Sequence, residues 1–113
     1  MSRGKVMKPN TSYTDNVMDR LTPLGEIGGR AMFGGYGIFH EGIMFGIISA
    51  DTLYFKVNDS NRAAYESAGS QPFPHSHSYY EVPTDVLDDT TQLHDWARAA
   101  LSVRDTTAKK KRR

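Results

Sequence analysis

The run Arg30-Ala31-Met32-Phe33-Gly34-Gly35-Tyr36-Gly37-Ile38-Phe39 decides the expected fold of this 113-residue chain. Apolar and aromatic residues alternate here with glycine, a composition that favours β-strands over helices. We therefore predict a first strand over about 30–39. Gly34 and Gly35 would form a bulge or a close backbone approach within that strand.

The residues that follow this run predict two more strands joined by short turns. A second strand is expected over about 43–49 and a third over about 52–57. In the third strand, Leu53, Phe55 and Val57 alternate onto one face. The connections at 40–42 and 50–51 are too short for crossovers, so the three strands should pair antiparallel.

Helical patterns flank the predicted sheet on both sides in sequence. Tyr13, Val17 and Leu21 recur at four-residue spacing, as on one helix face. A second helix is expected after the capping residues at 58–60. A last helix, capped by Asp89, shows apolar residues at the spacing i, i+3, i+4, i+7 and i+8: Leu93, Trp96, Ala97, Ala100 and Leu101.

The order of these elements predicts the fold class. Residues 70–78 have the composition of a loop, and 79–82 that of a short strand. The resulting order is helix, three strands, helix, one or two strands, helix. This is an α+β fold, a two-layer sandwich in which helices pack on one antiparallel sheet. We expect a flexible arm at 1–11, a single domain at 12–104 and a basic disordered tail at 105–113.

Composition excludes several classes of protein. The chain has no cysteine, which rules out disulfide scaffolds, thiol catalysis and thiolate metal sites. No apolar run approaches the ~18–20 residues of a membrane span. The charged start is not followed by the apolar segment of a signal peptide. We therefore expect a cytoplasmic protein without membrane contact.

Charge is divided between the body of the chain and its ends. Five of the 14 basic residues close the chain: Lys109, Lys110, Lys111, Arg112 and Arg113. Residues 9–108 hold six basic and all 13 acidic residues, a net charge of −7. An acidic body repels phosphates, so we expect any DNA contact to be weak or indirect. The tail is then either a solvated segment or a non-specific handle for nucleic acid or an acidic partner.

The run at 30–39 resembles the signature of the TfoX (Sxy) N-terminal domain family. The resemblance covers about 13–104, with further similar stretches at 42–46, 53–57, 61–65, 79–83 and 93–101. It implies a small two-layer α/β fold similar to that of type III secretion chaperones. The short segment 74–78 departs from the family pattern, so one strand is expected to be shortened or missing there.

The same resemblance implies a function in transcriptional regulation of DNA uptake. The best-known members act with the cyclic-AMP receptor protein at promoters. A protein partner, such as a transcription factor or a polymerase component, is therefore implied. The resemblance supplies no catalytic residues, and we expect a stand-alone N-terminal module that is not an enzyme.

The candidate functional residues form a recognition patch: Arg30, Met32, Phe33, Gly34, Gly35, Tyr36 and Gly37. Arg30 leads this set because the body has few basic residues and a guanidinium binds carboxylate or phosphate bidentately. We expect no cofactor and no metal. His75 and His77 have a metal-like spacing, but they stand in a proline- and serine-rich loop.

Two alternatives remain open at this point. Aromatic residues of the sheet could leave a face for a peptide or for a second subunit in a homodimer; they are Tyr36, Phe39, Phe45, Tyr54, Tyr79 and Tyr80. The glycine-rich turn with Arg30 could instead bind a small anion, either as a ligand site or in an uncharacterised enzyme.

Overall fold

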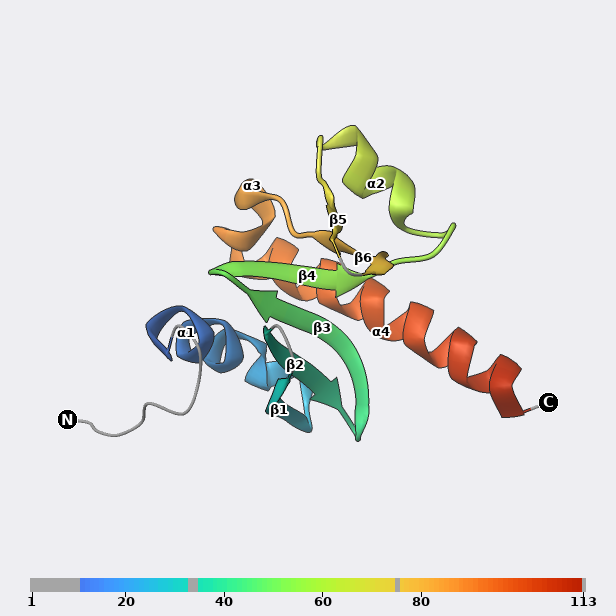
Figure 1. Cartoon of the computed structure of the whole chain (residues 1–113), viewed down its shortest axis with the longest axis horizontal. Helices are drawn as coiled ribbons and strands as arrows, with labels where there is room; N and C mark the ends of the chain where they lie inside the picture. The colour runs from blue at the N-terminus through green and yellow to red at the C-terminus, as the bar shows by residue number, and fades with distance from the viewer. Residues whose placement is uncertain (1–10, 33–34, 75, 113) are drawn as a thin grey trace.

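The computed structural model describes residues 11–32, 35–74 and 76–112, with the side chains of 12–32, 35–74 and 76–103. Its elements confirm the α+β class (Figure 1). They are α1 (Thr11–Leu21), the 3-10 helix η1 (Thr22–Leu24), β1 (Ile27–Met32), β2 (Gly35–His40), β3 (Ile43–Ser49), β4 (Thr52–Lys56), α2 (Arg62–Ser67), β5 (Pro72–Phe73), β6 (Ser76–Glu81), α3 (Thr84–Leu87) and α4 (Thr90–Arg112).

The strands form one antiparallel sheet in the order β1-β2-β3-β4-β6-β5. Two turns in this sheet have positive φ at both of their central residues. These are Glu41 (52°) and Gly42 (84°) between β2 and β3, and Ala50 (50°) and Asp51 (59°) between β3 and β4. Turns of this type match the right-handed twist of the flanking strands, which explains the tight hairpins.

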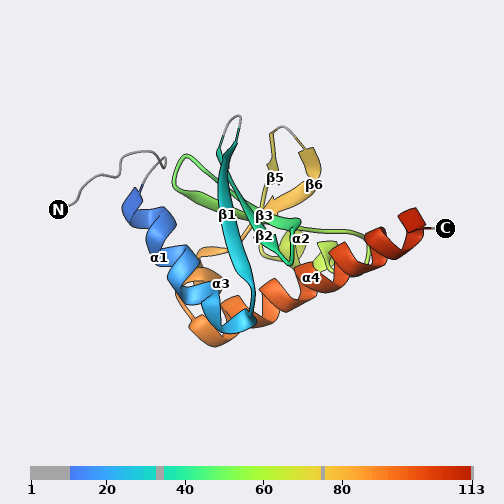
Figure 2. The same cartoon turned by 90° about the horizontal axis from the view of Figure 1, so that it is seen from below.

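The helices lie on one side of the sheet (Figure 2). Helix α4 packs against β3 and β4. Between the two layers lies the main core. Its fully buried side chains, each at most 1 % exposed, include Val17, Leu21, Ile38, Phe45, Ile48, Leu53, Phe55, Tyr65 and Leu93. The predicted stripe of α4 is confirmed, because Leu93, Ala97 and Ala100 are fully buried and Trp96 packs beside them.

The cap predicted for α4 is also confirmed. The backbone N–H of Gln92 donates to Asp89 Oδ1 at 3.2 Å, and the Gln92 amide donates to Asp89 Oδ2 at 3.3 Å. These hydrogen bonds lower the pKa of Asp89. The first of them supplies a partner to a backbone donor that the first turn of a helix otherwise leaves unsatisfied.

The prediction of one strand over 30–39 is wrong. The structure has two antiparallel strands there, β1 and β2, which pair from Ile27 with His40 to Met32 with Gly35. The physical reason is that adjacent glycines between two β-forming runs also suit a tight hairpin. Phe33 and Gly34 lie outside the described residues.

Three further differences concern the second half of the chain. The stretch 70–78, expected as a loop, contains β5 and the start of β6, and the strand expected over 79–82 spans Ser76–Glu81. Helix α3, four residues long, was not expected. The backbone of α4 stays helical through 105–112, where we expected a disordered tail, because alanine, lysine and arginine favour helices and no glycine or proline interrupts them. None of the described helices is long and apolar enough to cross a membrane.

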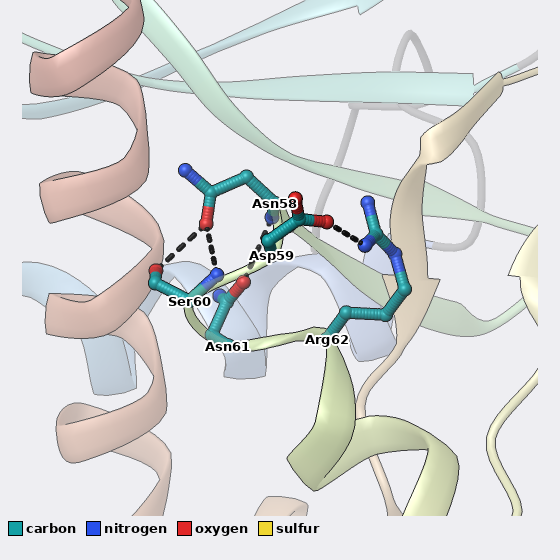
Figure 3. A network of polar contacts seen from close by, with 5 residues as sticks. All are labelled: Asn58, Asp59, Ser60, Asn61 and Arg62. Atoms are coloured by element: carbon teal, nitrogen blue, oxygen red, sulfur yellow. Dashed lines mark hydrogen bonds and ion pairs between the residues drawn. The ribbon is translucent and has the colours of Figure 1, made fainter.

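A polar turn leads from β4 into α2 (Figure 3). Asn58 Oδ1 accepts hydrogen bonds from the backbone N–H and the hydroxyl of Ser60, at 2.8 and 2.7 Å. Asn61 Oδ1 accepts from the backbone N–H of Asn58 at 2.9 Å, and Arg62 pairs with Asp59. Asparagine thus stabilises the turn before α2, whereas the residue that starts the helix, Asn61, makes no side-chain cap bond.

This turn places Tyr65 of α2 in the main core. Its ring packs edge-on to Trp96 at 4.7 Å between centroids and lies 6.0 Å from the ring of Tyr80. The Tyr65 hydroxyl is buried and has no hydrogen-bond partner. Burial therefore raises the pKa of Tyr65 above its ordinary value of 10.0.

We expect Tyr65→Phe to raise the free energy of unfolding at neutral pH by about 1 kcal/mol, because it removes a buried, unpaired polar group. The variant should also lose less stability in alkali. Above pH 10.0 the unfolded chain releases the Tyr65 proton before the folded chain does. The free energy of unfolding of the parent chain therefore falls as pH rises, by an amount that the phenylalanine variant does not lose. Urea unfolding at pH 7 and above pH 10 measures both effects. Equal alkaline slopes for the variant and the parent chain would contradict this account.

Candidate functional site

The sheet has a second face, which no described helix covers. The pairing register puts Arg30 opposite Gly37, and Phe39 opposite Met44, on this side. We call it the helix-free face. Its described residues include Gly28, Arg30, Met32, Gly35, Gly37, Phe39, Met44, Ile47, Tyr54, Lys56, Phe73 and Tyr79, and the register also puts Ser49, Thr52 and Glu81 on this side. Both edge hairpins, β1–β2 and β5–β6, rise on this side, away from α3 and α4 (Figure 2).

The helix-free face carries its own apolar cluster. Ile47, Phe73 and Tyr79 are buried there, at 9, 7 and 6 % exposed, and Met44 and Tyr54 pack against them. The ring of Phe73 meets that of Tyr54 edge-on at 4.8 Å. Because β6 lies between the strands of these two residues, Phe73 reaches across β6. The face is therefore a packed layer and not a set of isolated exposed side chains.

Two cations lie over aromatic rings on this face. The Arg30 guanidinium is 5.1 Å from the centre of the Phe39 ring, and Lys56 Nζ is 5.0 Å from that of Tyr79. Such contacts hold a cation in place without neutralising it. In the part of the chain that the structure describes, the ion pairs are Arg62–Asp59 and Arg98–Asp95, and neither involves Arg30.

The glycines of this region are explained by close packing. A Cβ on Gly37 would lie 2.4 Å from the sulfur of Met32 and 2.9 Å from that of Met44. A Cβ on Gly35 would lie 2.5 Å from the backbone oxygen of Ile48. Both methionine side chains thus cross the place where a larger residue at 37 would stand. The strands need these glycines whether or not an anion binds nearby.

The structure divides the patch predicted from sequence. Arg30, Met32, Gly35 and Gly37 lie together on the helix-free face. Tyr36 lies on the opposite face and packs against the main core. Phe33 and Gly34 are outside the described residues. The proposed aromatic face is divided in the same way: Phe39, Tyr54 and Tyr79 share the helix-free face, whereas Tyr36, Phe45 and Tyr80 belong to the main core.

Sequence reasoning missed the contributions of β3–β6 to this surface, above all Met44, Ile47, Lys56 and Phe73. The available signal was the alternation along each strand. The residues that alternate with the buried core positions are also largely apolar, which indicates a second packed face. Burial raises the pKa of Tyr79 and of Tyr54, and the charge of Glu81 raises that of Tyr54 further. These phenols therefore stay neutral around pH 7.

The other candidate sites lie elsewhere. Residues of α2 and α4, including Tyr65, Trp96 and Asp95, line a cavity of about 210 Å³. A more open one of about 410 Å³ lies beside Gly69, Glu81 and Asp85. His94 Nε2 is 2.6 Å from the backbone oxygen of Arg20 and joins α4 to α1. Three or more metal-binding side chains do not come together anywhere in the described residues, which exclude His75.

The basic residues at the end of the chain follow α4. Lys109, Lys110, Lys111 and Arg112 lie on its last helical turns, and Arg113 is outside the described residues. Their side chains are not described either. The role predicted for them therefore stays a prediction.

Comparison with known proteins relates this geometry to a family. A model of the TfoX N-terminal domain matches residues 19–103. A curated protein, the DNA transformation protein TfoX1 of Aliivibrio fischeri, is 36 % identical over 78 residues. This alignment covers 69 % of the chain and 37 % of the relative, so the chain spans little more than a third of that relative's length. The helix-free face lies entirely within the residues that the family model matches.

Proposed function

Since this chain belongs to the TfoX N-terminal domain family, we propose that it is a non-enzymatic regulatory factor for DNA uptake that acts through protein contacts. The role in DNA uptake is supported by the name of its Aliivibrio fischeri relative, a DNA transformation protein. The helix-free face carries the proposal for the mechanism. It offers a packed apolar layer with two cations at its surface.

The chemistry of this face suits recognition of another protein. Interfaces are enriched in aromatic residues, methionine and arginine, and methionine adapts its shape to a partner. Met32, on this face, is 41 % exposed. The partner we propose is a component of the transcription apparatus, either a transcription factor or a polymerase subunit. Direct DNA contact is limited in this proposal to the basic end of the chain, because residues 9–108 carry a net charge of −7.

Deletion of the gene in the organism that encodes this chain should lower the frequency of DNA transformation and the transcript levels of DNA-uptake genes. The parent chain should restore both. A Met32→Asp variant should restore transformation at least about tenfold less well, since a charge in an apolar contact weakens binding by ~1.4 kcal/mol or more.

The control for this experiment is Ala63→Asp, which adds the same charge at an exposed position of α2. It should complement like the parent chain. Thermal unfolding should show that both variants fold. An unchanged transformation frequency after deletion would refute the role in DNA uptake. Full complementation by Met32→Asp would refute the role of the helix-free face.

A further inference from the structure

Strand β1 is an open edge of the sheet. Within the described part of the chain it pairs with β2 alone, in a regular register of six residue pairs. All residues from Gly28 to Met32 are exposed. The strand contains no proline, no lysine and no bulge, three of the devices by which proteins protect their edges. Its one charged residue is Arg30, and the contact of helix α1 with β1 leaves Gly28–Met32 exposed. No other strand of the described residues pairs with the outward N–H and C=O groups of β1.

The side chains of β1 indicate which residues an added strand would need to carry. Residues of β1 alternate between the two faces, so Gly28, Arg30 and Met32 share the helix-free face. Arg30 is a fixed cation on the Phe39 ring, without a carboxylate partner among the described residues. Met32 is apolar and 41 % exposed. Above Gly28 the space is open, because a Cβ there would meet nothing within 4 Å.

We propose that β1 binds an extended segment of the partner protein, which adds to the sheet as a further strand and carries a carboxylate between two apolar residues. This proposal rests on the proposed function and names the chemistry of its partner. The carboxylate pairs with Arg30. The apolar residues two positions before and after it contact Met32 at one end and fill the space over Gly28 at the other. Backbone hydrogen bonds supply affinity and the alternate side chains supply specificity.

A second copy of the chain fits this edge less well. With the helix-free faces aligned, two-fold pairing of β1 centred on its arginine puts Arg30 opposite Arg30, and like charges directly opposite are destabilising. Centring on Gly29 avoids that clash but puts Arg30 opposite Gly28. Centring on Gly28 would put Arg30 opposite Glu26 of the other copy, but only residues 27–29 of the two β1 strands would then pair with each other. Two bodies of net charge −7 also repel one another. A partner segment with a carboxylate supplies the counter-charge for the Arg30 guanidinium.

The test uses a fluorescein-labelled probe peptide, Ser-Thr-Val-Thr-Asp-Thr-Val-Thr-Ser, and the full chain. Fluorescence anisotropy should show saturable binding. A peptide with lysine in place of aspartate should bind at least about tenfold more weakly, which corresponds to ~1.4 kcal/mol. Arg30→Glu should reverse this preference, and Arg30→Gln should abolish it. Arg98→Gln, which removes an exposed cation of α4, should leave it unchanged.

Strand addition has a further signature in the peptide backbone. Amides of alternate residues in a strand point to the same side. N-methylation of one alternate set in the probe should abolish binding, whereas methylation of the other set should leave most of it.

The opposite outcomes are equally specific. Absence of saturable binding overturns the proposal, as does binding that Arg30→Glu leaves unchanged. Sedimentation that shows a dimer dissociated by Arg30→Glu overturns it in favour of a second copy. If none of the peptides binds while Met32→Asp still restores transformation at least about tenfold less well than the parent chain, the proposed function stands and only strand addition fails. If gene deletion leaves transformation unchanged, the proposed function fails whatever the peptides do.

Discussion

Replacement of Phe55 by alanine is expected to lower the free energy of unfolding by about 3–5 kcal/mol. Phe55 is fully buried on β4 and its ring stacks on that of Phe45, with 5.9 Å between centroids and 29° between planes. Truncation removes both the buried area and the ring contact and leaves a cavity beneath α4. Since domains of this size have total stabilities of about 5–15 kcal/mol, the variant should be close to unfolding. Urea denaturation followed by circular dichroism measures the loss.

The comparison for this variant is Phe39→Ala, on the helix-free face. Phe39 is half-buried and contacts Arg30, so its loss should cost only about 1 kcal/mol. The ratio of the two effects locates the main core. If Phe55→Ala costs no more than Phe39→Ala, the assignment of the main core to the helix-covered face is wrong.

Replacement of Gly35 by alanine should destabilise the protein by about 1–3 kcal/mol, as overpacking does in well-packed interiors. The added Cβ would stand 2.5 Å from the backbone oxygen of Ile48 and 3.3 Å from the Cβ of Ser49. A backbone atom cannot rotate away as the end of a side chain can. Strands β2 and β3 would have to separate at this point, which weakens the hydrogen bonds between them. Thermal or urea unfolding measures the change.

Gly28→Ala provides the matched control on the neighbouring strand. A Cβ at this position meets nothing within 4 Å, and the residue has no positive φ. The substitution should be neutral or stabilise by up to about 1 kcal/mol, because alanine loses less backbone entropy on folding. Equal destabilisation by both substitutions would show that close approach to β3 is not the reason for glycine at position 35.

Much of the fold is encoded in local patterns of the sequence. The stripe of α4 and the alternation of β4 each bury one face of their element, and both predictions are confirmed. The predictions failed where the pattern was short or ambiguous. Glycines at 34 and 35 suit either a bulge or a hairpin. Only the pairing of 27–32 with 35–40 decides in favour of the hairpin. Strand β5 has two residues, one of them a proline, and depends on β6 and on the contact of Phe73 with Tyr54.

The candidate site was only half predictable for a related reason. Arg30, Met32 and Gly37 are close in sequence, so one motif contains them. The other half of the surface comes from β3, β4, β5 and β6. Alternation places each of Ile47, Tyr54 and Tyr79 on the face of its own strand that points away from the main core. The order of the strands in the sheet then decides that the three become neighbours. Tyr36 lies on the other face from Arg30, because Gly37 is the residue opposite Arg30 and adjacent residues of a strand point to opposite faces.

The two apolar layers also determine how firmly each strand is held along its length. Ile47 and Ile48 are consecutive residues of β3, yet one belongs to the cluster on the helix-free face and the other to the main core. A slip of β3 by one residue would exchange them and disrupt both layers at once. Strand β1 lacks this double constraint, since Ile27 is its only residue packed on the main core. Misaligned pairing during folding is therefore penalised most at the centre of the sheet, and the outermost strand keeps the freedom to adjust its alignment.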